Sequence, residues 1–151
     1  MHITISEVTA ADLNAIVELG IATNEADVIP HLSEQGKQAM RSARRQDMSA
    51  VADKMLYQAL KAELNGKLVA YVAWREGHYI AQLYVDSAYQ RSGVGRQLLT
   101  AVKRRVSART IKLKASCNSL GFYKKLGFVE TADPQCRNGI SFVPMALELP
   151  E

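Results

Sequence analysis

Residues 56–85 constrain the fold of this chain more than any other segment, because their pattern is that of three consecutive β-strands. The run LYQALKAEL alternates in polarity, and the Asn65-Gly66 dipeptide that follows it is typical of tight β-hairpin turns. KLVAYVAWR supplies a second strand, and EGHY forms another turn into YIAQLYV. The pattern predicts an antiparallel meander that ends at Val85.

The segment before the meander predicts a strand and two helices. Residues 2–8 are expected to form a short first strand, and residues 10–24 a helix that Thr9 or Asp12 could cap. Residues 31–55 are polar, basic and rich in helix formers, with few large apolar side chains. We expect this part either to cover a site or to form a mobile second helix.

The segment after the meander alternates helices with strands. A helix within residues 93–108 carries its apolar side chains on one side. These side chains are Val94, Leu98, Ala101, Val102 and Val106. The later elements are a buried strand at 110–116, a short helix at 119–126, and closing strands at 127–133 and 140–149 joined by a turn at 137–139. With no repeat or linker in between, residues 1–151 are expected to form a single mixed α/β domain.

Composition narrows the classes of partner. The chain has 19 Lys and Arg against 15 Asp and Glu, for a net charge of +4, which favours anionic ligands such as nucleotides or nucleic acid. Cys117 and Cys136 lack the spacing of a metal site, so no metal is expected. The N-terminus has no apolar signal core, and no stretch approaches the length of a membrane span, so we expect a cytoplasmic protein without a membrane partner.

The turn QRSGVG, residues 90–95, joins the end of the meander to the next helix. The backbone N–H groups of residues 91–96 could point at one spot there, and Gly93 and Gly95 would allow a ligand to approach closely. Arg91 and Arg96 add charged donors, so the turn suits a pyrophosphate. The residues that define a P-loop or a GxGxxG fingerprint are absent. A plain glycine-rich connection between strand and helix is the alternative.

Two segments together, LYVDSAYQRSGVGRQLL and ASCNSLGFYKKLGF, resemble the GNAT superfamily of acyl-CoA-dependent N-acyltransferases. The predicted order of elements is also similar to that of this family along essentially the whole chain. The resemblance implies a central, mostly antiparallel, splayed sheet of about six to seven strands, flanked by about four helices. It also implies acetyl-CoA as the cosubstrate.

The resemblance further assigns residues to the cofactor. The pantetheine arm would lie along Leu83, Tyr84 and Val85, where the strand ending at Val85 splays from the strand at 110–116. The backbone of Leu83 and Val85 would pair with the arm as an added strand. Ser116 and Asn118 are both candidates to reach the arm. The resemblance implies that the pyrophosphate is held by Gln90, Arg91, Ser92, Gly93, Val94, Gly95 and Arg96.

Catalytic roles follow from the same resemblance. Tyr123 falls where the family commonly has a tyrosine that protonates the leaving thiolate, and a phenol with a pKa of about 10 is protonated at neutral pH. A core aromatic residue is the alternative. His78 is a candidate for the general base because histidine side chains commonly exchange protons near neutral pH, but an exposed histidine of the hairpin is the favoured alternative. Glu63 and Glu76, on neighbouring strands, could instead act through water.

The sequence is compatible with three functions. The first is acetyl transfer from acetyl-CoA to a primary amine of a small molecule or protein, by direct attack in a ternary complex. The second is a non-catalytic acyl-CoA-binding or regulatory module with the same fold. The third is nucleic-acid binding through residues 103–109, although these basic residues are better interpreted as the exposed face of a helix, so no nucleic acid is expected. A second copy of the chain is a further potential partner.

Overall fold

The computed structural model describes residues 2–150. Its β-strands are β1 (Thr4–Glu7), β2 (Gln58–Leu64), β3 (Lys67–Arg75), β4 (Tyr79–Val85), β5 (Thr110–Ala115), β6 (Val129–Glu130), β7 (Gln135–Arg137) and β8 (Ile140–Glu148). Its α-helices are α1 (Leu13–Thr23), α2 (Glu34–Ser49), α3 (Val94–Arg105) and α4 (Leu120–Lys125). No helix in residues 2–150 combines the length and the apolar character that crossing a bilayer requires.

The predicted meander is confirmed. Strand β2 pairs antiparallel with β3, and β3 pairs antiparallel with β4. The first turn places Asn65 and Gly66 at φ values of 53° and 79°, and the second places Glu76 and Gly77 at 55° and 77°. These left-handed conformations match the right-handed twist of the strands they join, which is why Asn-Gly was a strong signal.

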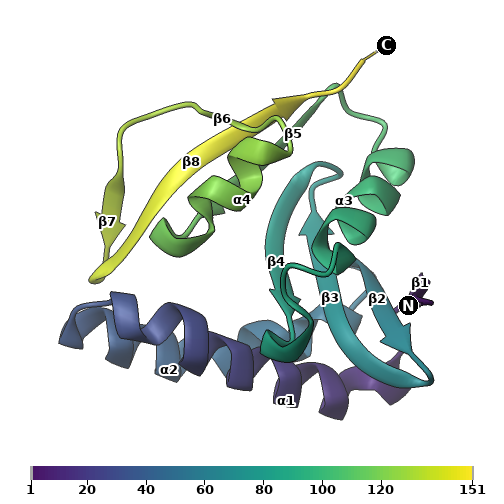
Figure 1. Ribbon diagram of the computed structural model, residues 1–151. Coiled ribbons are helices and arrows are strands. Elements are labelled where there is room, and N and C mark those ends of the chain that lie inside the picture. Colours follow the sequence, from purple (N-terminus) through teal and green to yellow (C-terminus); the bar gives the residue numbers. More distant parts are fainter. Residues whose placement is uncertain (1, 151) are drawn as a thin grey trace.

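The sheet is open and splayed, as expected. Its strands follow the order β1-β2-β3-β4-β5-β8-β6, with β7 paired to β8, and β4–β5 is the one parallel pair among the described strands. Strands β4 and β5 pair only at Tyr79 with Lys112 and at Ile80 with Leu113, and then diverge (Figure 1). The fold is therefore the mixed α/β arrangement expected from the sequence.

One closing strand was predicted incorrectly. The sequence suggested that residues 127–133 pair with the last strand across the turn at 137–139, but only Val129 and Glu130 form a strand there. The residues directly before the turn form an additional strand, β7, which pairs with β8. Pro134 lies between β6 and β7 and has no N–H to donate to the ladder, so it separates the two strands.

Helices cover both faces of the sheet (Figure 1). Tyr71 and Ala73 of β3 pack with Ile16 on the side of α1, whereas Val72 and Trp74 pack on the side of α3. The predicted apolar side of α3 is confirmed: Val94, Leu98 and Val102 are buried, and Ala101 and Val106 are partly buried. Burying one such Leu or Val contributes about 1.5–3 kcal/mol.

The α2 region is better anchored than its composition suggested. Met48 and Val51 are only 1% and 2% exposed. At its other end, the Ser33 hydroxyl accepts from Gly36 N at 3.1 Å, and the tip of the β7–β8 hairpin packs on the same turn of the helix. A Cβ atom on Gly36 would lie 2.2 Å from the carbonyl oxygen of Gly139. Two glycines distant in sequence therefore allow the hairpin to dock on α2.

The Gly36→Ala variant is expected to lose about 1–3 kcal/mol of unfolding free energy, because two backbones must separate to admit the methyl group. Urea unfolding measures this loss. Gly121→Ala is the matched control: it is also helical, and its Cβ would meet no atom within 4 Å. The control should equal or slightly exceed the parent protein in stability. Equal stability of Gly36→Ala and the parent would contradict the docking contact.

Candidate active site

A cavity of about 1090 Å³ opens where β4 and β5 diverge. Its walls include residues 80–85 of β4, the turn that follows β4, and parts of β5, α4 and β8. Residues after α1 and from α2, among them Val28 and Met40, complete the lining. This volume is at the upper end of ligand sites in proteins, so the cavity is large enough for an extended ligand.

The glycine turn forms one part of this lining. Arg91 and Gly93 have φ values of 64° and 90°, and α3 begins directly afterwards at Val94. A Cβ on Gly93 would meet no atom within 4 Å, so the space beside it is open to a ligand. Gly95 has a different role, because its Cβ would lie 3.0 Å from the ring of Phe122. This second glycine allows α4 to pack against α3.

Most of the predicted cofactor-binding residues lie around this one cavity. Those in its lining are Leu83, Tyr84, Val85, Gln90, Arg91, Gly93, Gly95, Arg96, Ser116, Asn118 and Tyr123. Two predicted residues are not in the lining. The Ser92 hydroxyl donates to the carbonyl oxygen of Tyr89, and the side chain of Val94 is buried in the core.

The Gln90 side chain is already bonded within the protein. Its amide nitrogen donates to Asp27 Oδ2 at 2.6 Å and to the carbonyl oxygen of Val85 at 3.1 Å. Both amide protons are therefore used, and Gln90 ties the turn to the segment that follows α1. This contact spans 63 positions in the sequence, and no local signal indicated it.

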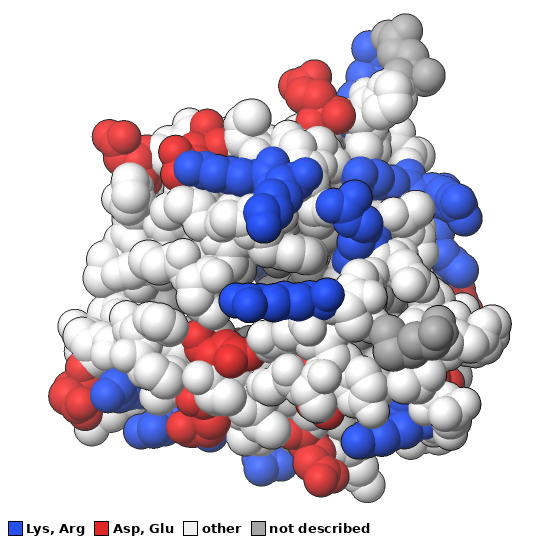
Figure 2. Space-filling model, viewed as in Figure 1, with Lys and Arg blue, Asp and Glu red and all other residues white. Residues whose placement is uncertain are grey.

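Positive charge dominates the cavity. Arg91, Arg96, Lys114 and Lys125 belong to its lining, and Asp27 is the one carboxylate among its described lining residues. Figure 2 shows Lys and Arg side chains gathered over the region that Figure 1 assigns to α3, α4 and the space between them. This distribution favours an anionic ligand.

Tyr123 is a buried phenol in the lining of the cavity. Its ring lies 5.2 Å from that of Phe122 and 5.5 Å from that of Phe128, both edge-on. Burial, with a smaller effect from Tyr84, raises the pKa of Tyr123 well above its usual value. The hydroxyl is therefore protonated at neutral pH and has no hydrogen-bond partner within residues 2–150.

Ser116 and Asn118 lie together where β5 leads into α4. The Ser116 hydroxyl donates to Asn118 Oδ1 at 2.8 Å and is 2.9 Å from the Ser119 hydroxyl. These contacts fix the Asn118 amide and leave its NH₂ group as the donor with no partner in the described chain. Of the two candidates for contact with the pantetheine arm, Asn118 is therefore the one whose side-chain donors are not already used.

His78 is not among the residues that line the cavity. Its carbonyl oxygen accepts from Lys112 N at the closed end of the splay, and its Nδ1 is 2.9 Å from the carbonyl oxygen of Glu76. At about 3.3 Å per residue, His78 lies about 16 Å along the chain from Leu83, where the family resemblance would place the pantetheine arm. The other candidate bases, Glu63 and Glu76, also lie outside the lining and are near Lys61 and Arg75, respectively.

The His78→Gln variant is consequently expected to keep kcat for acetyl transfer within about twofold of the parent value, because the ring is too distant to take a proton from an acceptor. Steady-state kinetics across pH 6–9 would check this. A large fall in kcat, with loss of the acidic limb of the pH profile, would instead support His78 as the base.

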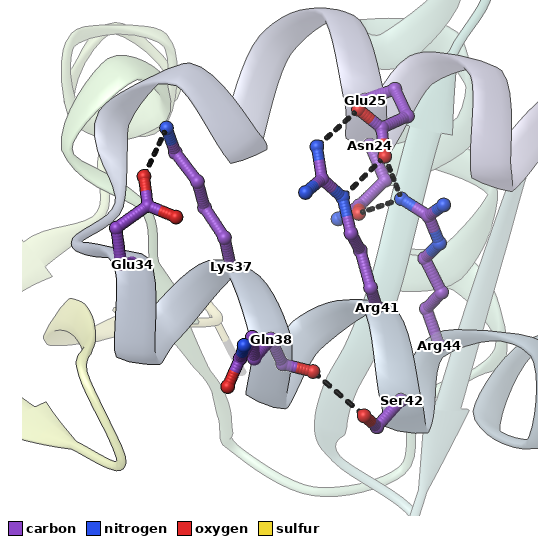
Figure 3. A network of polar contacts seen from close by, with 8 residues as sticks. All are labelled: Asn24, Glu25, Glu34, Lys37, Gln38, Arg41, Ser42 and Arg44. Atoms are coloured by element: carbon purple, nitrogen blue, oxygen red, sulfur yellow. Dashed lines mark hydrogen bonds and ion pairs between the residues drawn. The ribbon is translucent and has the colours of Figure 1, made fainter.

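A polar network joins the end of α1 to α2 (Figure 3). Glu25 accepts two hydrogen bonds from Arg41, at 2.8 and 3.1 Å, and one from Arg44 at 2.9 Å. The hydrogen bonds from Arg41 and Arg44 lower the pKa of Glu25 to about 2, so it is ionised at neutral pH. Arg44 also donates to Asn24 Oδ1 at 3.1 Å. No local pattern in the polar, basic segment 31–55 indicated this network, because its partners come from two different helical segments.

Comparison with known proteins identifies the family to which this chain belongs. Residues 28–149, most of the chain, match the acetyltransferase (GNAT) domain family, and the chain therefore belongs to this family of acetyltransferases. The comparison with curated proteins gives no match. Within residues 2–150 no group of three or more His, Cys, Asp or Glu side chains is arranged to hold a metal ion.

Solved structures share the fold over nearly the whole chain. A GCN5-related N-acetyltransferase from Rhodopseudomonas palustris has a TM-score of 0.84 at 21% identity, with 99% of this chain and 97% of that chain covered. The PaiA N-acetyltransferase from Thermoplasma acidophilum, solved with coenzyme A, has a TM-score of 0.76 at 18% identity, covering 98% and 99%. The ribosomal-protein-S18-alanine N-acetyltransferase from Escherichia coli has a TM-score of 0.66 at 21% identity, covering 99% and 96%.

Proposed function

We propose that this protein is an N-acetyltransferase that transfers the acetyl group of acetyl-CoA to a primary amine of a small molecule or protein, by direct attack in a ternary complex. The observation that carries the proposal is that the basic glycine turn and the buried phenol of Tyr123 line one and the same cavity. Membership of an acetyltransferase family and a structural neighbour solved with coenzyme A support it.

Coenzyme A would be bound through positive charge and through backbone groups that the surrounding strands and helices leave unpaired. The N–H groups of residues 91–96, the positive end of α3 and the guanidinium groups of Arg91 and Arg96 suit a pyrophosphate. Beyond Ile80, the edge of β4 that faces the gap is not paired with β5. Such an edge can accept an extended arm as an added strand, so we assign the pantetheine arm to residues 83–85.

Each group would have one task in the reaction. The lone pair of a neutral amine attacks the thioester carbon, the C–N bond forms, and the C–S bond breaks as the tetrahedral intermediate collapses. Tyr123 gives its proton to the leaving sulfur, the proton lost by the amine passes to water, and water returns a proton to Tyr123. Because burial disfavours phenolate and thiolate alike, the raised pKa of Tyr123 does not prevent this transfer within the cavity.

A thiol-release assay with acetyl-CoA against a library of primary amines tests the function. Acceptor-dependent release of coenzyme A, with an acetylated product detected by mass spectrometry, is the expected result. Tight binding of acetyl-CoA without turnover on any amine would contradict the proposal and favour a non-catalytic acyl-CoA-binding module.

A further inference from the structure

Besides Tyr123, the phenols of Tyr84 and Tyr89 line the cavity, and Tyr84 is the one that packs against α1. Its ring lies 5.8 Å from that of Tyr71 and packs with the cluster that also holds Ile16 of α1. Tyr123 belongs to the other cluster, on the side of α3. Tyr84 and Tyr123 therefore reach the gap between β4 and β5 from opposite faces of the sheet.

The direction of the hydrogen bond at Tyr84 is determined by its neighbours. Arg44 can only donate, so the oxygen that receives its hydrogen bond is Asn24 Oδ1. The Asn24 NH₂ group must then face Tyr84, and it donates to the Tyr84 hydroxyl oxygen at 3.4 Å. Asn24 is fully buried, and the same Arg44 nitrogen that bonds to it also donates to Glu25 at 2.9 Å (Figure 3).

It follows that the Tyr84 hydroxyl accepts from the protein and keeps its own proton for another partner. Within residues 2–150 no acceptor for that proton is found. Burial raises the pKa of Tyr84, so the proton is retained at neutral pH. The side chain is thus a hydrogen-bond donor in the wall of the cavity.

We propose that the Tyr84 hydroxyl donates a hydrogen bond to the carbonyl oxygen of the bound thioester and stabilises the oxyanion that forms there, with Asn24 as its positioning residue. The inference rests on the acetyltransferase function proposed above. A neutral amine needs its lone pair for attack and cannot accept this proton, whereas the thioester oxygen gains charge as nitrogen adds. In that step the C=O π pair moves to oxygen and later returns as the C–S bond breaks, so Tyr84 keeps its proton throughout.

Two variants test the proposal. Tyr84→Phe removes the donor, and Asn24→Asp reverses it: a carboxylate still accepts from Arg44 but now also accepts from Tyr84, which turns the proton away from the cavity. Tyr79→Phe is the matched control, since Tyr79 is on the same strand but outside the cavity lining. Both test variants should lower kcat by about 10²-fold with unchanged affinity for acetyl-CoA. The control should not.

Isotope-edited infrared spectroscopy of bound [1-¹³C]acetyl-CoA provides a readout that needs no acceptor. The carbonyl stretch should lie at lower frequency in the parent protein than in Tyr84→Phe or Asn24→Asp. An unchanged frequency in Tyr84→Phe would overturn the inference, as would a rise in the KM for the acceptor with kcat retained. A shifted carbonyl without turnover on any amine would support the hydrogen bond and contradict the proposed function. Failure of the parent protein to bind acetyl-CoA would overturn both.

Discussion

Gly93→Asp is expected to abolish measurable binding of acetyl-CoA while the protein stays folded. The position is open, with no atom within 4 Å of the new Cβ, so the substituent would project into the proposed pyrophosphate site. Two like charges about 4 Å apart repel by about 4 kcal/mol at an intermediate effective dielectric, which corresponds to about a 10³-fold loss of affinity. Isothermal titration calorimetry measures this loss.

Gly93→Asn is the matched control for this variant. Asparagine has nearly the same shape as aspartate and must adopt the same left-handed φ of 90°, so the pair differs mainly in charge. Binding should survive, though weakened, in Gly93→Asn. Equal affinities of the two variants would contradict an anion at this position. A substitution at Gly95 is less informative, because its Cβ would press against Phe122.

Tyr123→Phe is expected to lower kcat by about 10²-fold, the lower end of the effect of general acid–base catalysis. The edge-on ring contacts with Phe122 and Phe128 remain, and the lost hydroxyl has no partner within residues 2–150, so fold and stability should be preserved. The affinity for acetyl-CoA should be nearly unchanged. Steady-state kinetics combined with calorimetry separates the two effects.

The outcome of this experiment decides the role of Tyr123. A kcat within about twofold of the parent value would mean that water or another group protonates the sulfur. A loss of affinity for acetyl-CoA with kcat retained would mean that Tyr123 contributes to binding and not to proton transfer. The Tyr79→Phe variant, which loses a phenol of β4 outside the cavity lining, serves as the control for nonspecific effects.

The parts of the fold that could be predicted are those with local signals. Asn65-Gly66 indicated its hairpin, and the apolar side of α3 indicated its buried residues. The divergence of β4 and β5 was expected only from the family resemblance, because nothing in either strand alone specifies a partner. The additional strand β7 was missed because three exposed residues, 135–137, have no alternation that distinguishes a strand from a loop.

In the candidate site, the glycine turn and Tyr123 could be singled out from the sequence because each lies in a short, contiguous motif. The Gln90–Asp27 contact and the chain from Arg44 through Asn24 to Tyr84 were not found, because they join side chains 20 to 63 positions apart. Which atom donates in such a contact depends on the three-dimensional arrangement, and only the structure supplies it.

A crystal structure with coenzyme A would show directly where the cofactor binds. We expect pyrophosphate oxygens at about 2.7–3.2 Å from backbone nitrogens of residues 91–96, with the arm between β4 and β5. A second hollow, of about 510 Å³, is lined by Lys103 and Arg104 of α3 and by Leu149. Coenzyme A bound there, with the gap between β4 and β5 empty, would contradict the assignment of the cofactor to that gap.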